Sequence, residues 1–229
     1  MAELRRNDQH PGSHGDALAD APGGRAAPPG PARSWVVETP RGPARIKLDE
    51  PAGEVVSLLV LGHGAGGDVD APDLMAVRNA VLPRGVAVAR ITQPYRVAGR
   101  RTPAPAAQLD EAWVAAVAAV RSGATLILGG RSSGARVACR TARQLGAAGV
   151  IALAFPEHPP GRPEKSRGAE LRTGVPTLVV NGERDPFGRP EPSDGVEVRL
   201  IPGDHSLKRD RPALAALVVE WLTAHGWAR

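Results

Sequence analysis

Cysteine is almost absent from this sequence of 229 residues, since Cys139 is the only one. A single cysteine excludes an intrachain disulfide bond and any metal site that needs several cysteine ligands. Aromatic residues are scarce as well, at 3% of the chain, although hydrophobic residues of all kinds make up 42%. The core must therefore consist mainly of alanine, valine and leucine, and we expect Cys139 to pack within it.

Long apolar segments are also missing. No stretch approaches the roughly 18 uninterrupted apolar residues that indicate a membrane-spanning helix. The basic pair Arg5 and Arg6 near the start is not followed by the apolar segment of a secretory signal. These absences predict a soluble, cytoplasmic protein without membrane association.

The formal net charge of +5 raises the question of nucleic-acid binding. The first 33 residues hold four arginines against four acids, so the excess belongs to the rest of the chain. There the basic residues are scattered, and they lack the interleaved aromatic residues on which bases stack. The pattern favours an arginine-rich solvated surface, and we predict no nucleic-acid partner.

Residues 1–33 are polar and rich in proline and glycine. Such a composition offers too little apolar surface to offset the entropy of ordering the chain. We therefore predict a disordered tail over residues 1–33 and one folded domain over residues 34–229, which is a normal size for a single α/β domain.

Strand and helix patterns alternate through this domain. Two short alternating segments around a Pro/Gly turn predict an antiparallel hairpin, 35–38 with 44–48. A continuous apolar run interrupted only by Ser57 predicts a strand buried on both faces at 55–61. Further strands are expected at 86–91, 125–128, 150–155, 177–180 and 196–201. Helices are expected at 73–81, 106–120 and 212–223, and one after residue 134. This order predicts a mostly parallel sheet with an antiparallel N-terminal edge hairpin and helices on both faces.

The segment from Gly129 to Gly134 contains the pattern G-x-S-x-G, with Ser132 at its centre. It lies between a predicted strand and a predicted helix. A strand that turns sharply into a helix holds the central serine in strained geometry and exposes its side chain above the sheet. Because a Gly/Ser-rich loop also begins ordinary helices, the meaning of the motif depends on partners elsewhere in the chain.

Two later strand ends supply such partners. Asp185 follows the apolar run 177–180, and His205 follows the run 196–201. The carboxyl ends of parallel strands meet at one edge of a sheet, so both loops can reach the rim where Ser132 stands. The order serine, aspartate, histidine is the order of catalytic triads in α/β hydrolases.

These residues have the chemistry of acyl transfer. We expect His205 to accept the proton of the Ser132 hydroxyl, and Asp185 to orient the imidazole. The backbone N–H groups of Ala65 and Ser133 are the candidate oxyanion-hole donors.

Other residues compete for the roles of acid and base. Asp194 and Asp204 are alternative acids, although Asp204 is disfavoured because the side chains of adjacent residues diverge. His158 is the alternative base, in a proline-rich loop after another strand. Ser132 itself remains consistent with a plain helix cap.

The glycines at 62, 64 and 67 match the dinucleotide-binding pattern G-x-G-x-x-G. That pattern needs its third glycine inside the helix that receives the pyrophosphate. Here several residues separate the third glycine from the expected helix, and Arg90 stands where an acid is required. We predict no cofactor and no metal ion.

As an ordered set, these motifs resemble the α/β-hydrolase superfamily. More narrowly, the chain is similar to small proteins related to dienelactone hydrolases and to testis-expressed α/β-hydrolase-like proteins. The resembling segments are 61–67, 93–95, 99–101, 129–136, 158–161, 182–188 and 203–205. The resemblance implies the α/β-hydrolase fold and a triad. Dienelactone hydrolases typically use a cysteine where this chain has Ser132, so dienelactone is not the expected substrate.

Many α/β hydrolases carry a cap domain where this chain has only residues 156–175, so we expect no substantial cap and an open site. The candidate substrate-binding residues are His63, Tyr95, Arg131 and His158. Arginines near the rim suit an anionic substrate, with solvated loop charges as the alternative. His63 is also expected to order the oxyanion loop.

The predicted function is a serine hydrolase that cleaves a small-molecule carboxylic ester or thioester. The alternative is a non-catalytic interaction or scaffold protein that keeps the fold. A peptidase is a weaker option, because nothing in the loops separates an ester from an amide. The acyl group, the alcohol group and the oligomeric state are left open.

Overall fold

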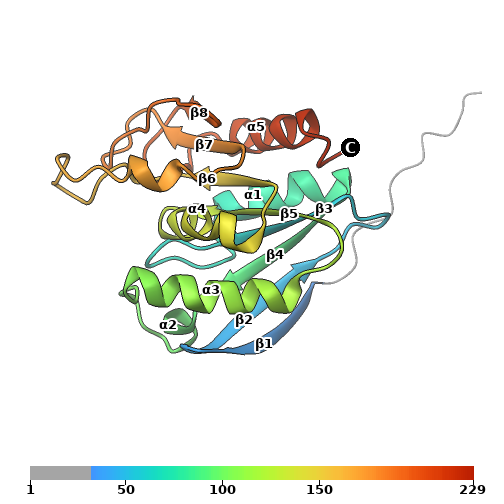
Figure 1. Ribbon diagram of the computed structural model, residues 1–229. Helices are drawn as coiled ribbons and strands as arrows, with labels where there is room; N and C mark the ends of the chain where they lie inside the picture. The colour runs from blue at the N-terminus through green and yellow to red at the C-terminus, as the bar shows by residue number, and fades with distance from the viewer. Residues whose placement is uncertain (1–31) are drawn as a thin grey trace, which may run out of the picture.

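The computed structural model describes residues 32–229, so the predicted tail of residues 1–33 lies outside the described residues apart from its last two. Eight strands form one sheet in the order β1-β2-β4-β3-β5-β6-β7-β8 (Figure 1). Their bounds are β1 Arg33–Thr39, β2 Gly42–Asp49, β3 Ser57–Gly62, β4 Val86–Thr92, β5 Thr125–Arg131, β6 Gly149–Leu153, β7 Thr177–Gly182 and β8 Val196–Ile201.

Strand directions divide the sheet into two parts. From β4 across to β8 every neighbouring pair is parallel, whereas β2 is antiparallel to both β1 and β4. All residues of β3 and β7 are buried, as a strand covered on both faces requires. The predicted mostly parallel sheet with an antiparallel N-terminal edge hairpin is confirmed.

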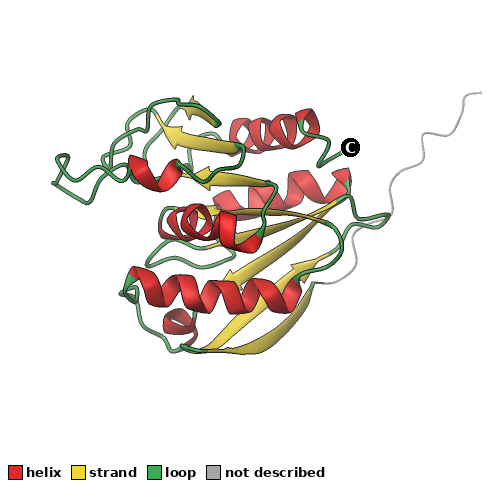
Figure 2. Ribbon diagram, in the orientation of Figure 1, coloured by secondary structure: helices red, strands yellow, loops and turns green. Residues whose placement is uncertain are grey.

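Helices cover both faces of this sheet (Figure 2). The apolar residues of α3 and α4 join one core cluster, and those of α1 and α5 join a second cluster on the opposite face. The helix bounds are α1 Pro72–Val81, α2 Pro94–Val97, α3 Ala106–Val120, α4 Ser133–Leu145 and α5 Arg211–Ala224, with 3₁₀ helices η1 Leu82–Arg84 and η2 Gly168–Leu171. Within residues 32–229, no helix has the length and apolar character needed to cross a membrane.

Helix α4 packs closely on the sheet because its inward face carries small side chains. Gly134, Ala138 and Ala142 are all buried along that face. The helix ends at Gly146, whose φ of 61° is a left-handed conformation that glycine adopts without strain. Cys139 is also buried on α4, within the core where the sequence predicted it.

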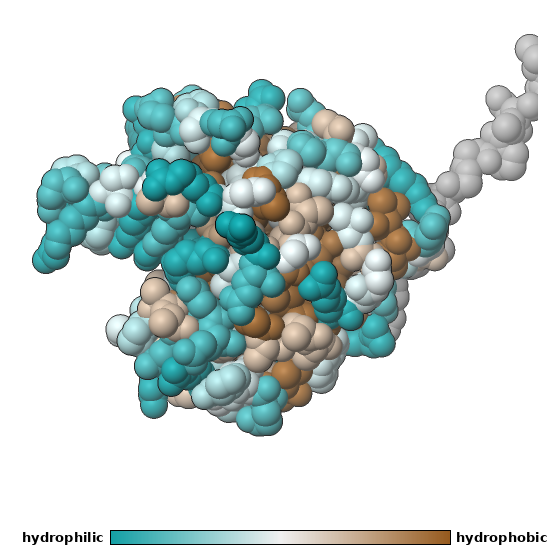
Figure 3. Space-filling view, in the orientation of Figure 1, coloured by the Kyte–Doolittle hydropathy of each residue, from teal (hydrophilic) through white to brown (hydrophobic). Residues whose placement is uncertain are grey.

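Two connections shape the carboxyl edge of the sheet. After β4 the chain forms the short helix α2, which is not among the helices predicted from the sequence, and Pro94 at its first position supplies a φ suited to a helix start. Between β6 and β7 the chain makes only a loop and η2, which confirms the absence of a substantial cap. This loop extends beyond the strands on the left of Figure 1, and Figure 3 shows a largely hydrophilic projection there.

Candidate active site

The turn between β5 and α4 holds Ser132 in a strained backbone conformation, with φ 53° and ψ −108°. A residue with a side chain rarely adopts a positive φ, and such strain costs about 1–3 kcal/mol. The Ser132 N–H donates to the carbonyl of Leu153 on β6 at 2.8 Å. This bond ties the turn to the neighbouring strand, and Ser132 lines a cavity at the carboxyl edge of the sheet.

The turn between β5 and α4, which we call the elbow, has flanking glycines that allow close packing. A Cβ atom on Gly134 would lie 2.4 Å from the carbonyl carbon and oxygen of Gly62, and one on Gly130 would lie 2.6 Å from that oxygen. Side-chain atoms do not tolerate such distances to backbone, so glycine at both positions is what lets α4 approach β3. The elbow is therefore fixed against the strand that leads into the candidate oxyanion loop.

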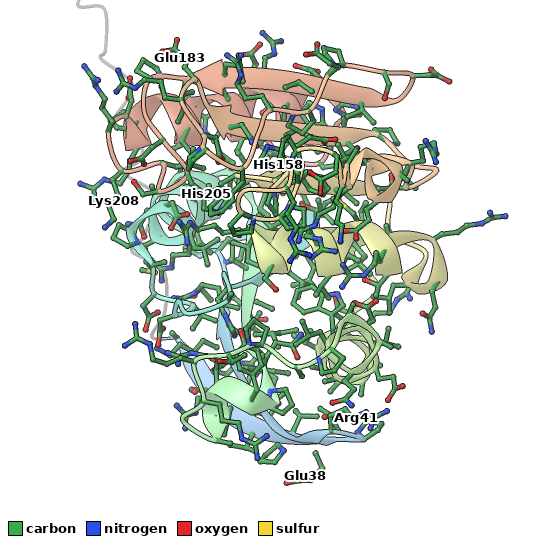
Figure 4. The ribbon with its side chains drawn as sticks, turned by 90° about the vertical axis from the view of Figure 1, so that its left-hand side faces the viewer. Glu38, Arg41, His158, Glu183, His205 and Lys208 are labelled. Carbon is green, nitrogen blue, oxygen red and sulfur yellow. The ribbon has the colours of Figure 1, made fainter. Side chains whose placement is uncertain are left out.

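His205 joins the serine to the carboxylate. Its Nε2 lies 2.9 Å from Ser132 Oγ, and its Nδ1 lies 2.8 Å from Asp185 Oδ2. The imidazole also packs edge-on against Phe187, with ring centroids 4.4 Å apart. Figure 4 looks onto this edge of the sheet and shows His205 near the middle. The structure thus brings the three predicted triad residues into one hydrogen-bonded chain.

The carboxylate of Asp185 is held from several sides. Its side chain is completely buried. Oδ1 accepts the N–H of Phe187 at 2.9 Å, and Oδ2 lies 3.4 Å from the amide nitrogen of Asn181. Gly182 at the end of β7 lets the loop that carries His205 approach. A Cβ atom on Gly182 would lie only 2.4 Å from the Asp204 carbonyl oxygen in that loop, so a side chain at this position would push the loop away.

The competing acids and the competing base lie outside this chain of hydrogen bonds. Asp204 is exposed and its side chain caps its own turn. Asp194 is exposed in the loop before β8. His158 contacts a carbonyl of its own loop through Nδ1 at 2.9 Å. Within residues 32–229, the side chains of all three lack a hydrogen bond to Ser132 or His205.

The two residues that carry the candidate oxyanion-hole amides, Ala65 and Ser133, line the cavity. Ser133 is the first residue of α4, so its N–H has no acceptor within the helix. In the described part of the chain, the N–H of Ala65 also has no acceptor. Both residues line the same cavity as Ser132. The predicted donors therefore lie beside the predicted nucleophile.

His63 and Tyr95 hold the loop that carries Ala65. Burial lowers the pKa of His63, so the ring is neutral near pH 7. Its Nε2 accepts the N–H of Gln93 at 3.1 Å, which leaves Nδ1–H to donate to the Gly64 carbonyl at 2.8 Å. The Tyr95 hydroxyl donates to the Ala65 carbonyl at 2.6 Å. Both side chains brace the loop, and neither lines the cavity.

Arg131 precedes the candidate nucleophile in sequence, and its side chain contacts the loop of His205 and helix α1. Its Nη2 donates to the His205 carbonyl at 3.0 Å, and its Nε lies 3.0 Å from Oδ2 of Asp73 on α1. The Asp73 carboxyl is buried. Burial raises the pKa of Asp73, and the positive charge of Arg131 opposes that rise. Arg131 and His158 are also absent from the cavity lining.

The cavity at Ser132 has a volume of about 290 Å³. Apolar residues form much of its wall: Pro103, Ala104, Leu109, Pro156, Pro160 and Phe187. Three arginines also line it, Arg136 and Arg140 from α4 and Arg167 from the loop before η2.

These three arginines were missed by the sequence analysis. A signal existed for the α4 pair, because Arg136 and Arg140 follow Ser133 at three- and four-residue steps and so share its helix face. No local pattern places Arg167, which reaches the cavity through the fold of a long loop.

The described residues form neither a dinucleotide-binding site nor a metal site. The glycine pattern after β3 is separated from α1, which begins only at Pro72. Arg90 is buried and paired with Asp49 at 2.9 Å. Within residues 32–229, no group of three or more His, Cys, Asp or Glu side chains is arranged to hold a metal ion.

The fold and the linked serine, histidine and aspartate define the chain as α/β-hydrolase-like, and comparison with family models narrows the class. Residues 55–215 match the family described as an alpha/beta hydrolase domain. This segment runs from before β3 into α5 and includes all three linked residues. The chain therefore belongs to the α/β-hydrolase domain family. Among curated proteins no sequence matches it.

Solved structures share the fold at low sequence identity. A lidless α/β serine hydrolase from Xanthomonas campestris is 20% identical, with 87% of this chain and 98% of that chain covered and a TM-score of 0.67. A serine hydrolase homologue from Coxiella burnetii is 18% identical, with 83% and 97% covered and a TM-score of 0.68. Dienelactone hydrolase from Anabaena variabilis is 18% identical, with 86% and 98% covered and a TM-score of 0.65.

Proposed function

We propose that the chain is a serine hydrolase that cleaves a small-molecule carboxylic ester or thioester. The observation that carries this proposal is the unbroken hydrogen-bonded chain from Asp185 through His205 to Ser132 at the mouth of a cavity. Membership in the α/β-hydrolase domain family and the likeness to solved serine hydrolases support the same reaction class.

In the first half of the reaction, Ser132 Oγ attacks the carbonyl carbon while its proton moves to His205 Nε2. Asp185 accepts a hydrogen bond from Nδ1–H and stabilises the imidazolium that forms. The negative oxygen of the tetrahedral intermediate binds the N–H groups of Ala65 and Ser133, each contributing about 3 kcal/mol to transition-state stabilisation. The imidazolium then protonates the departing alcohol or thiol, which leaves an acyl group on Ser132.

In the second half, a water molecule takes the place of the leaving group. His205 accepts a proton from this water as its oxygen attacks the acyl carbon, and the same oxyanion donors stabilise the second intermediate. Collapse of that intermediate returns the proton to Ser132 Oγ and releases the carboxylic acid. Water is the only reactant needed besides the ester or thioester.

Three of the four predicted substrate-binding residues receive a different role in this proposal. His63 and Tyr95 position the oxyanion loop, and Arg131 positions the backbone of His205, because their polar atoms are engaged with those segments. His158 stays a predicted substrate contact.

A fluorophosphonate probe tests the nucleophile directly. We expect stoichiometric labelling of the folded protein, mapped by mass spectrometry to Ser132 rather than to the adjacent Ser133. The Ser132→Ala variant should not be labelled, while Ser122→Ala, which changes an exposed serine after α3, should be labelled normally. Labelling that persists in Ser132→Ala, or folded protein that resists the probe, would overturn the proposal.

A further inference from the structure

The cavity wall carries three positive charges, and two of them are neutralised within the protein. Arg136 forms a two-point pair with Glu170, with Nε–Oε2 at 2.9 Å and Nη2–Oε1 at 2.5 Å. Arg140 forms a two-point pair with Asp110 at 2.8 and 2.6 Å, and it also reaches Glu170 at 3.2 Å. Two arginines thus match two carboxylates, and their guanidinium groups are fixed in place.

Arg167 is the third positive charge, and it has no such partner. Within residues 32–229 its guanidinium forms neither a hydrogen bond nor an ion pair, although its backbone N–H donates to the Glu157 carbonyl. The Glu157 carboxylate is not part of the cavity lining: Oε1 accepts a hydrogen bond from Ser166, and among the described residues the buried Oε2 has no hydrogen-bond partner. Arg167 therefore places on the wall of the cavity that contains Ser132 a guanidinium with no directly bonded carboxylate, although the charges of Glu157 and Glu170 act on it from a distance.

The environment of Arg167 is unfavourable for an isolated cation. Partial burial lowers the pKa of Arg167, and the positive charges of Arg136 and Arg140 act in the same direction. The negative charges of Glu170 and Glu157 oppose this shift of the pKa without cancelling it. Arginine nevertheless stays charged near pH 7. An anion bound beside Arg167 would offset the repulsion, and a planar carboxylate matches the guanidinium in two-point geometry.

We propose that Arg167 binds a carboxylate of the substrate, so that the ester or thioester cleaved at Ser132 carries a free carboxylate on a short chain. This inference rests on the proposed hydrolase function. The chain is short because Arg167 and Ser132 line one and the same cavity, so the carboxylate and the ester carbonyl must both lie within it. Leu109 and Phe187 line the apolar part of the same cavity and would contact the methylene groups.

Matched ester pairs test this specificity. Phenyl pentanoate and monophenyl glutarate differ only by a terminal methyl or carboxylate in the acyl part. Butyl acetate and 4-acetoxybutanoate differ in the same way in the alcohol part. We expect the carboxylate member of at least one pair to have a kcat/KM about 10- to 100-fold higher than its neutral partner, the range of a charged hydrogen-bonded contact.

The variant Arg167→Gln should abolish this preference by raising KM for the carboxylate ester, so that kcat/KM becomes equal within about twofold for the two members of the pair. Retained hydrolysis of the neutral ester also shows that the variant is folded. Arg162→Gln is the matched control, because Arg162 is an exposed arginine of the same loop that does not line the cavity. An absence of preference in both pairs, or a preference that survives Arg167→Gln, would refute the inference.

Glutarate binding separates this inference from the proposed function. Glutarate should raise the thermal unfolding temperature of the wild type and of Ser132→Ala, but not of Arg167→Gln, at matched ionic strength. If no ester is hydrolysed and glutarate still stabilises the protein through Arg167, the anion site stands and the hydrolase proposal fails. If esters are hydrolysed without a carboxylate preference and glutarate has no effect, the inference alone fails.

Discussion

Arg131 and Arg167 lie on opposite sides of the candidate nucleophile, and they differ in what their charges contact. Arg131 is engaged with Asp73 and with the His205 carbonyl, whereas Arg167 faces the cavity without a partner. We call Arg131, its partner Asp73 on α1, and the residues His63 and Tyr95 that hold the loop of Ala65 the support side. We call the residues that line the cavity together with Arg167 the cavity side. The comparison teaches that the partners of an arginine, rather than its closeness to the candidate nucleophile in sequence, indicate whether it supports the scaffold or is free to contact a substrate, as proposed for Arg167.

The largest expected effect comes from His205, whose imidazole contacts Ser132 and whose backbone carbonyl accepts a hydrogen bond from Arg131. Replacing His205 with alanine removes the proposed base, and kcat/KM for a neutral ester should fall about 10⁴-fold. Glutarate should still stabilise this variant, because Arg167 is unchanged. Steady-state kinetics and thermal unfolding measure the two effects, with His225→Gln near the end of α5 as the control histidine variant. Residual activity within tenfold of the wild type would contradict the proposed role of His205.

On the support side, Arg131→Met should weaken stability and kcat together. Removing the guanidinium leaves Asp73 buried without its counter-charge, which costs about 3 kcal/mol in the free energy of unfolding. A displaced His205 backbone should also lower kcat about 10- to 100-fold. Urea unfolding and ester kinetics test this, and Asp73→Asn added to Arg131→Met should restore part of the stability.

The same variant sharpens the comparison between the two arginines. The ratio of kcat/KM values for carboxylate and neutral esters should be unchanged in Arg131→Met, although both values fall. If the ratio fell toward 1 in Arg131→Met, Arg131 would contact the substrate carboxylate and the division into two sides would be wrong.

A smaller effect is expected where the elbow meets β3. The Cβ atom of Gly134→Ala would lie 2.4 Å from the carbonyl of Gly62, so α4 must shift outward. We expect a loss of about 2 kcal/mol in the free energy of unfolding, typical of overpacking. Gly123→Ala is the matched control, since no atom lies within 4 Å of its added Cβ. Equal stability of the two variants in urea would argue against the close approach.

The smallest predicted effect is a pH dependence on the support side. Burial lowers the pKa of His63 in the folded protein, whereas the unfolded chain has the ordinary value of about 6.5. Below that pH the unfolded state binds a proton that the folded state does not. The free energy of unfolding should therefore fall as the pH drops below about 6.5, by at most about 1.4 kcal/mol per pH unit. Urea unfolding at several pH values should show a weaker slope for His63→Gln, and an unchanged slope would contradict the assignment.

Much of the architecture could be predicted because local patterns decide it. Apolar runs predicted the buried strands such as β3 and β7. Asp185 and His205 follow the ends of β7 and β8 by only a few residues, so parallel strands bring both to the same edge of the sheet. The candidate oxyanion residues Ala65 and Ser133 followed in the same way from the ends of β3 and β5. In these cases a residue and the strand that positions it are close in sequence.

The cavity wall could not be predicted in this way. Arg131 drew attention because it precedes Ser132, yet its ion pair with Asp73 depends on how α1 packs against the elbow. Arg167 belongs to a long loop, and its place follows from tertiary contacts that no spacing rule describes. The short helix α2 was missed although Pro94 offered a local signal for a helix start.

The backbone strain at Ser132 has a consequence for how the site meets its substrate. The positive φ is held by the hydrogen bond to Leu153 and by the contact of α4 with β3, both of which form when the chain folds. In the proposed mechanism, the reorganisation needed to aim the Ser132 hydroxyl and the candidate oxyanion donors is then complete before any substrate arrives. Each catalytic cycle would begin from a polar environment that is already arranged, so little of its activation barrier would come from moving the protein.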